Sequence, residues 1–444
     1  MEIKITSRET IKPFLPTSDE HKFFQLCLFD QLQLITYLPT LLFYPKKEGL
    51  QEPYHVCAQL KKSLSETLTI FYPLAGRRKS HTFITCNDEG VLFLEAKVNL
   101  NMVEFLTPPK LEFLNKLLPC EPNKVHLNGE ALPQVLVQVN IFSCGGIAIG
   151  TCNLHTLLDG CSGSLFYSTW AAICSGSRQE RPHPDFYSAS SFFPPLNHLS
   201  LHDHVAHEDS QTQKKCTTRR FVFNAESINT LRAEAKDDDG ESSKSPTRYE
   251  ALAAFIWKHM TLACKTESRD STRPSVAIHI VDMRRRMGEP FSKYTIGNIL
   301  WPVMAFCETV NANTGIGYLV SIAREKFGKL SRELYLRVKS DPNILGSNQC
   351  VNLPQGIETR SPIPVVLTSW CGLNFNELDF GWGKPLWVGV RGGDQETLPN
   401  VAVIIETDAG MEAWLTMEMQ HIVILEKDME FLRLALPNPS VSNI

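Results

Sequence analysis

The sequence predicts a large protein of two domains that combines strands with helices. The chain has 444 residues, of which 43% are hydrophobic and 21% charged, so it can bury a sizeable core and divide into two domains. Residues 135–142 and 146–154 alternate apolar and polar side chains around a Ser-Cys-Gly turn, which is typical of two adjacent strands. Helices are expected at residues 163–174 and 247–265.

The segment that joins the two domains is expected between residues 175 and 217. It contains four prolines and becomes polar toward its end, which is typical of a long crossover. We therefore place an N-terminal domain at residues 1–200, a crossover loop at residues 201–217 and a C-terminal domain at residues 218–444. No internal repeat is visible in the sequence.

Charge and hydropathy exclude several classes of protein. A formal net charge of −4 offers no basic surface of the kind that nucleic acids require, and residues 284–286 form only a short arginine cluster. Residues 1–9 are too charged for a secretory signal. The best apolar run, residues 34–44, contains Pro39 and is too short to span a bilayer. We therefore expect a cytoplasmic protein with neither nucleic-acid nor membrane partners.

The cysteines and histidines do not predict a metal site. The 13 cysteines show no Cys-x-x-Cys spacing, and their odd number suits reduced thiols in a reducing compartment. Four histidines lie between His198 and His207, but they have no ligand spacing on a defined element.

One histidine lies where it could act as a base. His155 follows the predicted strand 146–154, and an imidazole can accept a proton near neutral pH. A histidine at a strand end is also often a hydrogen-bonded structural residue. Asp159, four positions later, would share a helical face with His155 and could orient the ring as in hydrolytic triads. Gly160 and Gly163 instead favour a turn, in which Asp159 would fix the loop to a basic partner.

A second segment adds to this pattern. Residues 379–385 read Asp-Phe-Gly-Trp-Gly-Lys-Pro, and with the His-x-x-x-Asp-Gly of residues 155–160 they resemble the paired signature of the plant BAHD acyl-CoA-dependent acyltransferases. Further matches, in the same order as in the family, lie at residues 71–77, 247–258, 282–287, 297–298 and 368–370. The chain looks most similar to the branch that includes vinorine synthase and other alkaloid acetyltransferases, judging from residues 30–32, 368–371 and 412–415.

The resemblance implies a fold and a location for the site. The family has an α/β fold of two similar-sized, chloramphenicol acetyltransferase-like domains joined by a long crossover loop, with the active-site channel between them. His155 would lie in this channel, open to acyl-CoA from one face and to an alcohol from the other. Part of residues 368–385 would pack back against the first domain.

The resemblance also implies catalytic roles. His155 would be the general base that deprotonates the acceptor alcohol. The Thr368 hydroxyl and the Trp370 indole would stabilise the tetrahedral oxyanion, although simple core packing is an alternative for Trp370.

Other residues are expected to support the site or to bind the donor. Asp159 would pair with Arg284 and hold the loop that carries His155. Asp379, Gly381, Trp382 and Gly383 would have a structural role in their own loop. Lys258, Arg285 and Arg286 are candidates for contacts with the phosphates of coenzyme A, the alternative being a solvated basic face.

The sequence therefore predicts an acyl-CoA-dependent O-acyltransferase of plant specialised metabolism. The favoured reaction transfers acetyl from acetyl-CoA to a hydroxyl of an alkaloid or other hydrophobic alcohol, in a monomer without metal or bound cofactor. Direct attack is preferred, since no serine or cysteine lies in a nucleophile-elbow context. Alternatives are transfer of malonyl or a longer acyl group, acylation of an amine, or a non-catalytic protein that binds coenzyme A. A hydrolase that uses His155 with a distant serine is disfavoured, because the sequence lacks the Gly-x-Ser-x-Gly elbow.

Overall fold

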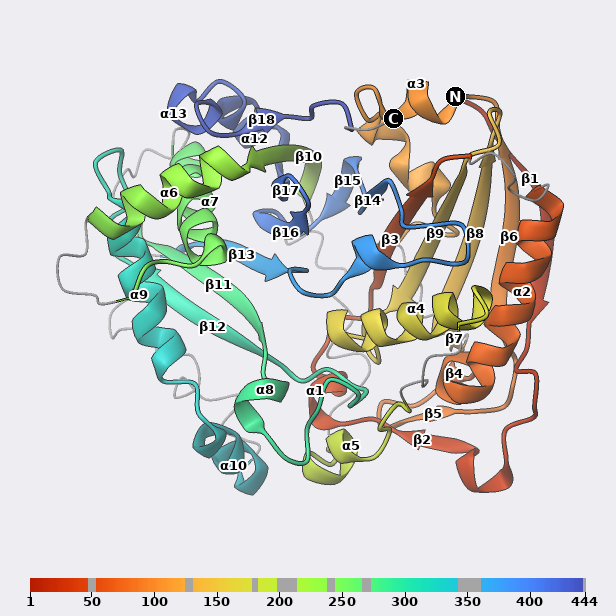
Figure 1. Cartoon of the computed structure of the whole chain (residues 1–444). Coiled ribbons are helices and arrows are strands. Elements are labelled where there is room, and N and C mark those ends of the chain that lie inside the picture. The colour runs from red at the N-terminus through yellow and green to blue at the C-terminus, as the bar shows by residue number, and fades with distance from the viewer. Residues whose placement is uncertain are drawn as a thin grey trace.

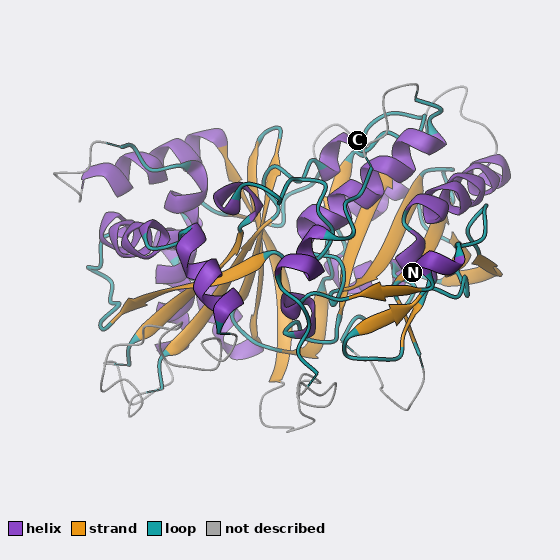
Figure 2. Ribbon diagram, turned by 90° about the horizontal axis from the view of Figure 1, so that it is seen from below, coloured by secondary structure: helices purple, strands orange, loops and turns teal. Residues whose placement is uncertain are grey.

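The computed structural model describes residues 1–46, 53–123, 131–177, 183–197, 214–237, 244–265, 273–341 and 361–441. Two large sheets dominate it, one built mainly from the first half of the chain and one from the second (Figure 1). Seen after a turn of 90°, the two groups of strands lie side by side, with helices packed on them (Figure 2). This mixed α/β arrangement agrees with the predicted fold class.

The first sheet has six strands in the order β1-β6-β8-β9-β3-β14, and two helices, α2 and α4, pack together against one face of it. The bounds are β1 (Ile3–Ile11), β3 (Tyr37–Tyr44), β6 (Val91–Val98), β8 (Val135–Phe142), β9 (Ile147–Leu154), β14 (Trp387–Gly389), α2 (Pro53–Ile70) and α4 (Gly160–Cys174).

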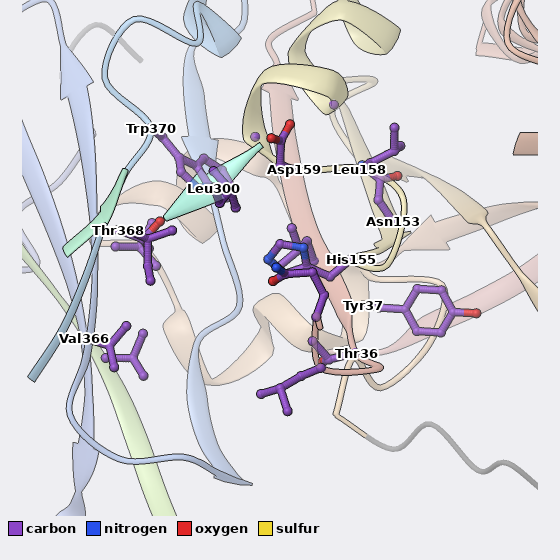
Figure 3. Close-up of a pocket in the computed structure, with 18 of the residues that line it drawn as sticks. Thr36, Tyr37, Asn153, His155, Leu158, Asp159, Leu300, Val366, Thr368 and Trp370 are labelled. Atoms are coloured by element: carbon purple, nitrogen blue, oxygen red, sulfur yellow. The ribbon is translucent and has the colours of Figure 1, made fainter. Parts of the chain in front are cut away.

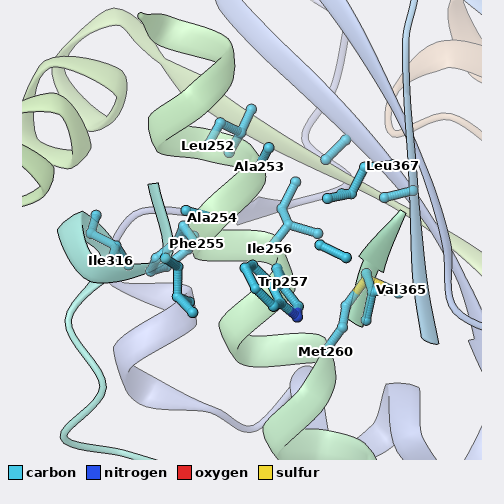
Figure 4. Close-up of a cluster of buried hydrophobic side chains, with 14 of the residues drawn as sticks. Leu252, Ala253, Ala254, Phe255, Ile256, Trp257, Met260, Ile316, Val365 and Leu367 are labelled. Atoms are coloured by element: carbon cyan, nitrogen blue, oxygen red, sulfur yellow. The ribbon is translucent and has the colours of Figure 1, made fainter. Parts of the chain in front are cut away.

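The second sheet runs in the order β12-β11-β13-β16-β17-β10-β15, with β18 paired to β10. Its strands are β10 (Lys214–Asn224), β11 (Ser275–Asp282), β12 (Leu300–Cys307), β13 (Ile363–Ser369), β15 (Gly393–Thr397), β16 (Val401–Thr407), β17 (Gly410–Glu418) and β18 (Leu436–Pro437). Its helices are α6 (Ala225–Asp237), α7 (Arg248–Lys265), α9 (Ile316–Gly328), α12 (Met419–Leu425) and α13 (Met429–Leu432). Buried side chains of α7, among them Trp257, pack near Val365 and Leu367 of β13 (Figure 4).

Smaller elements complete the fold. A four-stranded sheet has the order β2-β5-β4-β7. Its strands and the remaining short helices are β2 (Phe23–Gln25), β4 (Arg77–Arg78), β5 (Phe83–Thr85), β7 (Leu132–Pro133), α1 (Leu28–Gln31), α3 (Met102–Leu106), α5 (Ser188–Phe192), α8 (Arg284–Met287) and α10 (Arg332–Ser340). Within the described ranges, no helix combines the length and the hydropathy needed to cross a bilayer.

The predicted hairpin is confirmed, but its polar positions are not on a solvated face. Strands β8 and β9 pair antiparallel, and every residue of β9 is buried. Gln138 and Asn140 of β8 are buried too, and their side-chain amides donate to the carbonyls of Lys116 and Leu117 at 3.1 and 2.9 Å. These hydrogen bonds compensate for the lost hydration of the amides. The alternation of apolar and polar residues in β8 therefore belongs to a sheet that is covered on both faces.

The predicted connection between the domains needs one correction. Residues 214–217, expected in the crossover loop, form the start of β10 and pair with β15 and β17. Residues 198–213, with the four histidines, lie outside the described residues. The halves are also interleaved, since β14 belongs by sequence to the second half and pairs with β3 of the first sheet.

The tight packing of β9 gives a testable prediction. A Cβ added at Gly150 would lie 2.1 Å from the backbone oxygen of Leu117. We expect Gly150→Ala to lower the free energy of unfolding by about 1–3 kcal/mol through overpacking, measured by urea denaturation. Gly328→Ala is the matched control because the added methyl group meets nothing within 4 Å there. An equal loss of stability in both variants would contradict the packing argument.

Candidate active site

A cavity of about 910 Å³ lies between the two halves, and both contribute to its wall (Figure 3). The first half supplies residues from the start of β3, the end of β9 and the start of α4, and the second half supplies residues of β11, β12, β13, β16 and β17. The lining is mainly apolar. Its larger apolar side chains include Phe29, Leu32, Leu34, Ile35, Tyr37, Trp301, Met304, Trp370, Phe375 and Leu398.

His155 lies on this wall directly after β9. Its backbone N–H donates to the carbonyl of Thr36 at 2.9 Å, and its own carbonyl accepts from Asn298 Nδ2 at 2.8 Å. The backbone of His155 is therefore held from both halves of the chain. The ring nitrogen Nδ1 is buried, which leaves Nε2 as the nitrogen that faces the cavity.

The surroundings of the His155 ring favour its neutral form. Burial lowers the pKa of His155 below its ordinary value, and the negative charge of Asp159 opposes this effect only in part. An imidazole with a pKa below about 6.5 is largely unprotonated at neutral pH and can accept a proton.

Asp159 anchors the loop and does not orient the histidine. It is the N-cap of α4, where its Oδ1 accepts from the backbone N–H of Ser162 at 2.8 Å. Arg284 Nη1 donates to Asp159 Oδ2 at 2.8 Å, and Nη2 donates to Oδ1 at 3.2 Å. Both side chains are almost fully buried. The sequence left open whether Asp159 orients His155 on a shared helical face or lies in a turn and pairs with a basic residue. The structure shows the second arrangement.

Arg284 connects this loop to the second half of the chain. Its guanidinium also donates to the carbonyls of Thr295 and Gly297 and to Asp282. The charges of Asp159 and Asp282 raise the pKa of Arg284 although burial acts against them, so the group stays cationic. The pairing expected between Asp159 and Arg284 is thus present.

Asn298 and Asp30 form a second brace that the sequence did not assign. Asn298 Nδ2 donates to the His155 carbonyl and also, at 2.9 Å, to Asp30 Oδ1. Asp30 is fully buried, which raises the pKa of its carboxyl group. Gly297 and Asn298 appear among the family matches, but their residue types carry no chemistry that would have predicted a bond to the histidine.

Thr368 and Trp370 lie on the opposite wall of the cavity from His155 (Figure 3). Thr368 is near the end of β13, and the backbone N–H of Trp370 donates to the carbonyl of Ile404 at 2.8 Å. The indole also packs against Phe375, with ring centroids 5.1 Å apart. Trp370 therefore both packs against its neighbours in the core and lines the cavity.

The second signature segment supports the fold and does not line the cavity. Asp379 Oδ1 accepts from the backbone N–H groups of Gly381 and Gly383, each at 2.7 Å. These glycines have φ values of +109° and +97°, which side chains rarely allow. Trp382 is buried in the core of the first half, as is Phe380, so the expected packing of this region against the first domain is confirmed.

The three cations proposed for coenzyme A do not come together. Lys258 is buried on α7, its Nζ donates to Glu430 at 2.9 Å, and it does not line the cavity, so the geometry does not support its proposed role. Arg286 is exposed and donates to the carbonyl of Phe327. Arg285 is exposed and does not line the cavity either; burial raises the pKa of the neighbouring Cys161 thiol to about 11, and the charge of Arg284, with a smaller effect of Arg285, opposes it.

In the part of the chain that the structure describes, no group of three or more His, Cys, Asp or Glu side chains is placed to hold a metal ion.

Comparisons with known proteins agree with this architecture. The Transferase family model matches residues 1–432. Akuammiline synthase 2 from Alstonia scholaris is 36% identical over 99% of this chain and 98% of its own length. A limonoid 21-O-acetyltransferase from Melia azedarach is 32% identical over 99% and 100%.

A solved structure is also similar over its whole length. The crystal structure of vinorine synthase superposes with a TM-score of 0.82 at 30% identity and covers 99% of this chain and 100% of that one. By sequence, vinorine synthase from Rauvolfia serpentina is 33% identical over 94% of the chain and 95% of its own length. The two-domain architecture, the His-x-x-x-Asp-Gly loop on the cavity wall and these matches establish that the chain belongs to the BAHD acyltransferase family.

Proposed function

We propose that the protein transfers acetyl from acetyl-CoA to a hydroxyl of an alkaloid or other hydrophobic alcohol, with His155 as the general base. The observation that carries this proposal is a histidine with a lowered pKa on the wall of a large, mainly apolar cavity between the two halves. Relatives of the chain named as acetyltransferases or alkaloid synthases support the choice of acetyl and of a hydrophobic acceptor.

The reaction proceeds by direct attack in this mechanism. His155 Nε2 removes the hydroxyl proton as the acceptor oxygen bonds to the thioester carbonyl carbon. The tetrahedral intermediate then collapses, the carbon–sulfur bond breaks, and the imidazolium returns the proton to the thiolate of coenzyme A. The sequence has no nucleophile elbow, which favours this route over a covalent acyl-enzyme.

Charge develops on the carbonyl oxygen during the attack. The Thr368 hydroxyl and the Trp370 indole N–H, on the wall opposite His155, are the donors that we assign to this oxyanion. A preorganised donor of this kind contributes roughly 3–4 kcal/mol to transition-state stabilisation.

Purified protein given acetyl-CoA and a panel of polycyclic alcohols should release free thiol and yield acetylated product of the expected mass. Competition between acetyl-CoA and malonyl-CoA for the same acceptor identifies the donor. Thioester hydrolysis that is equally fast with and without an acceptor would refute the transferase mechanism.

The pH profile follows from the state of His155. The unprotonated imidazole is the active form, so kcat/KM should be constant near neutral pH and fall as the pH drops through the pKa of His155. Because burial lowers this pKa, we expect the half-maximal rate below pH 6.5. The rate of thiol release between pH 4.5 and 8.5 measures it, provided that circular dichroism shows a folded protein throughout. A half-maximal rate at pH 7.5 or above would contradict this assignment.

A further inference from the structure

One permanently charged cation lines the cavity. Among the described lining residues, Arg391 is the single lysine or arginine. It follows β14 closely in the chain, and its partners Asn123 and Thr397 line the cavity with it.

Among the residues that the structure describes, the hydrogen-bond partners of Arg391 are neutral. Its guanidinium donates to Asn123 Oδ1 and, at 3.2 Å, to Thr397 Oγ1. Burial lowers the pKa of Arg391 to about 10, which still leaves it cationic at neutral pH. The described lining residues include two carboxylates, Asp159 and Asp282, and both accept from Arg284 instead. A desolvated guanidinium without a carboxylate is costly unless a ligand supplies the negative charge.

Strand pairing shows how far Arg391 lies from the proposed base. Gly389, the last residue of β14, pairs with Leu41 of β3, and continuing this register by two residues would bring Arg391 level with Pro39. Tyr37 pairs with Leu154 of β9, so His155 lies beside Thr36. Three positions along the strands and two strands across correspond to a separation on the order of 10–15 Å. One wall connects the two residues, since Thr36 Oγ1 donates to the carbonyl of Pro122, next to Asn123.

We propose that Arg391 binds a carboxylate of the acceptor, at the end of the molecule remote from the hydroxyl that is acylated. This inference rests on the proposed function and adds a class of acceptor to it: a rigid, mainly apolar alcohol that carries an acidic group. The mainly apolar lining of the cavity suits the body of such a molecule, and a guanidinium is the side chain best shaped for a carboxylate.

Two other sources of negative charge fit less well. The carboxylate of a malonyl donor is a single methylene group away from the reacting carbonyl, too close to reach Arg391 from a thioester held at His155. Coenzyme A carries several phosphate charges, whereas Arg391 is the single lysine or arginine among the described lining residues, and its one charge balances one carboxylate.

The test compares polycyclic alcohols as free acids and as methyl esters, beginning with yohimbic acid and yohimbine. Binding is measured by titration calorimetry and turnover by thiol release from acetyl-CoA. In the wild-type enzyme the acids should bind at least about tenfold more tightly than their esters. Arg391→Gln should remove this preference by weakening only the acids, and Arg391→Lys should restore part of it. Inclusion of malonyl-CoA and of free coenzyme A shows whether the donor depends on Arg391 instead.

Arg433→Gln is the matched control, because it removes an exposed arginine paired with Glu234 away from the cavity and should leave the preference unchanged. The proposal is overturned if no acid in the panel binds better than its ester, if Arg391→Gln weakens acids and esters alike, or if the variant loses only donor affinity. Failure of the proposed function is a separate result, namely an acid preference that depends on Arg391 without thiol release from any acceptor.

Discussion

Replacing His155 with alanine is expected to lower kcat for acyl transfer by about 10²–10⁴, the usual cost of losing a general base. The imidazole is the only ionisable group that we assign to proton transfer, and the other polar groups of the site would still bind both substrates. KM values should therefore change much less than kcat. Thiol release with saturating acetyl-CoA measures the effect.

The fold should survive this change, because the loop is held through the backbone of His155 by Thr36 and Asn298. Thermal unfolding of His155→Ala should accordingly lie close to that of the wild type. His183→Ala serves as the control, since His183 is exposed and does not line the cavity. A His155→Ala enzyme with full turnover would remove the general-base assignment.

The second large effect is expected at the buried ion pair. Asp159→Ala leaves the cation of Arg284 inside the protein with its principal carboxylate gone, and breaking such a pair costs about 3–5 kcal/mol. The loop between β9 and α4 also loses its helix cap, worth about another 1 kcal/mol. We expect a large drop in the urea midpoint of unfolding. Activity should also be lost, because the loop that carries His155 would be displaced.

Asp282 provides a control, because it pairs with the same arginine but is partly exposed. It accepts from Arg284 Nη1 at 2.9 Å, and its side chain is 42% exposed. Asp282→Asn should therefore change the free energy of unfolding by less than about 1 kcal/mol, as exposed pairs usually do. The pH dependence of the rate tests whether Asp159 takes part in proton transfer. In folded Asp159→Asn, the remaining activity should still fall as the pH drops through the pKa of the His155 imidazole. A profile without this acidic limb would assign proton transfer to Asp159.

Local patterns predicted the elements around the site well. The alternation of residues 135–154 specified both strands of the hairpin, and the motif separated the expected roles of His155 and Asp159. Helix α4 begins three residues before the predicted start, because Asp159 caps it at Gly160. Its glycines had suggested a longer turn. The monomeric state and the cytoplasmic location stay predictions from the sequence.

Long-range contacts were beyond the sequence. Lys258 was proposed for the donor from its position in a family motif, but the direction in which α7 faces pairs it with Glu430. Arg391 was not singled out, since nothing near it in the chain distinguishes a cavity arginine from a surface one. Asn298 and Asp30 lie 268 positions apart, and only the fold brings them together behind His155.

The pairing of β14 with β3 determines how the chain can be divided. The first half expressed alone would lack Trp387, Val388 and Gly389, and β3 would become an unprotected sheet edge with main-chain groups open to another strand. It would also lack Phe380 and Trp382, which come from the second half of the chain and are buried in its core. Neither half should therefore be soluble when expressed alone. Co-expressed halves, by contrast, should recover solubility together, because each then supplies the strand or the surface that the other lacks.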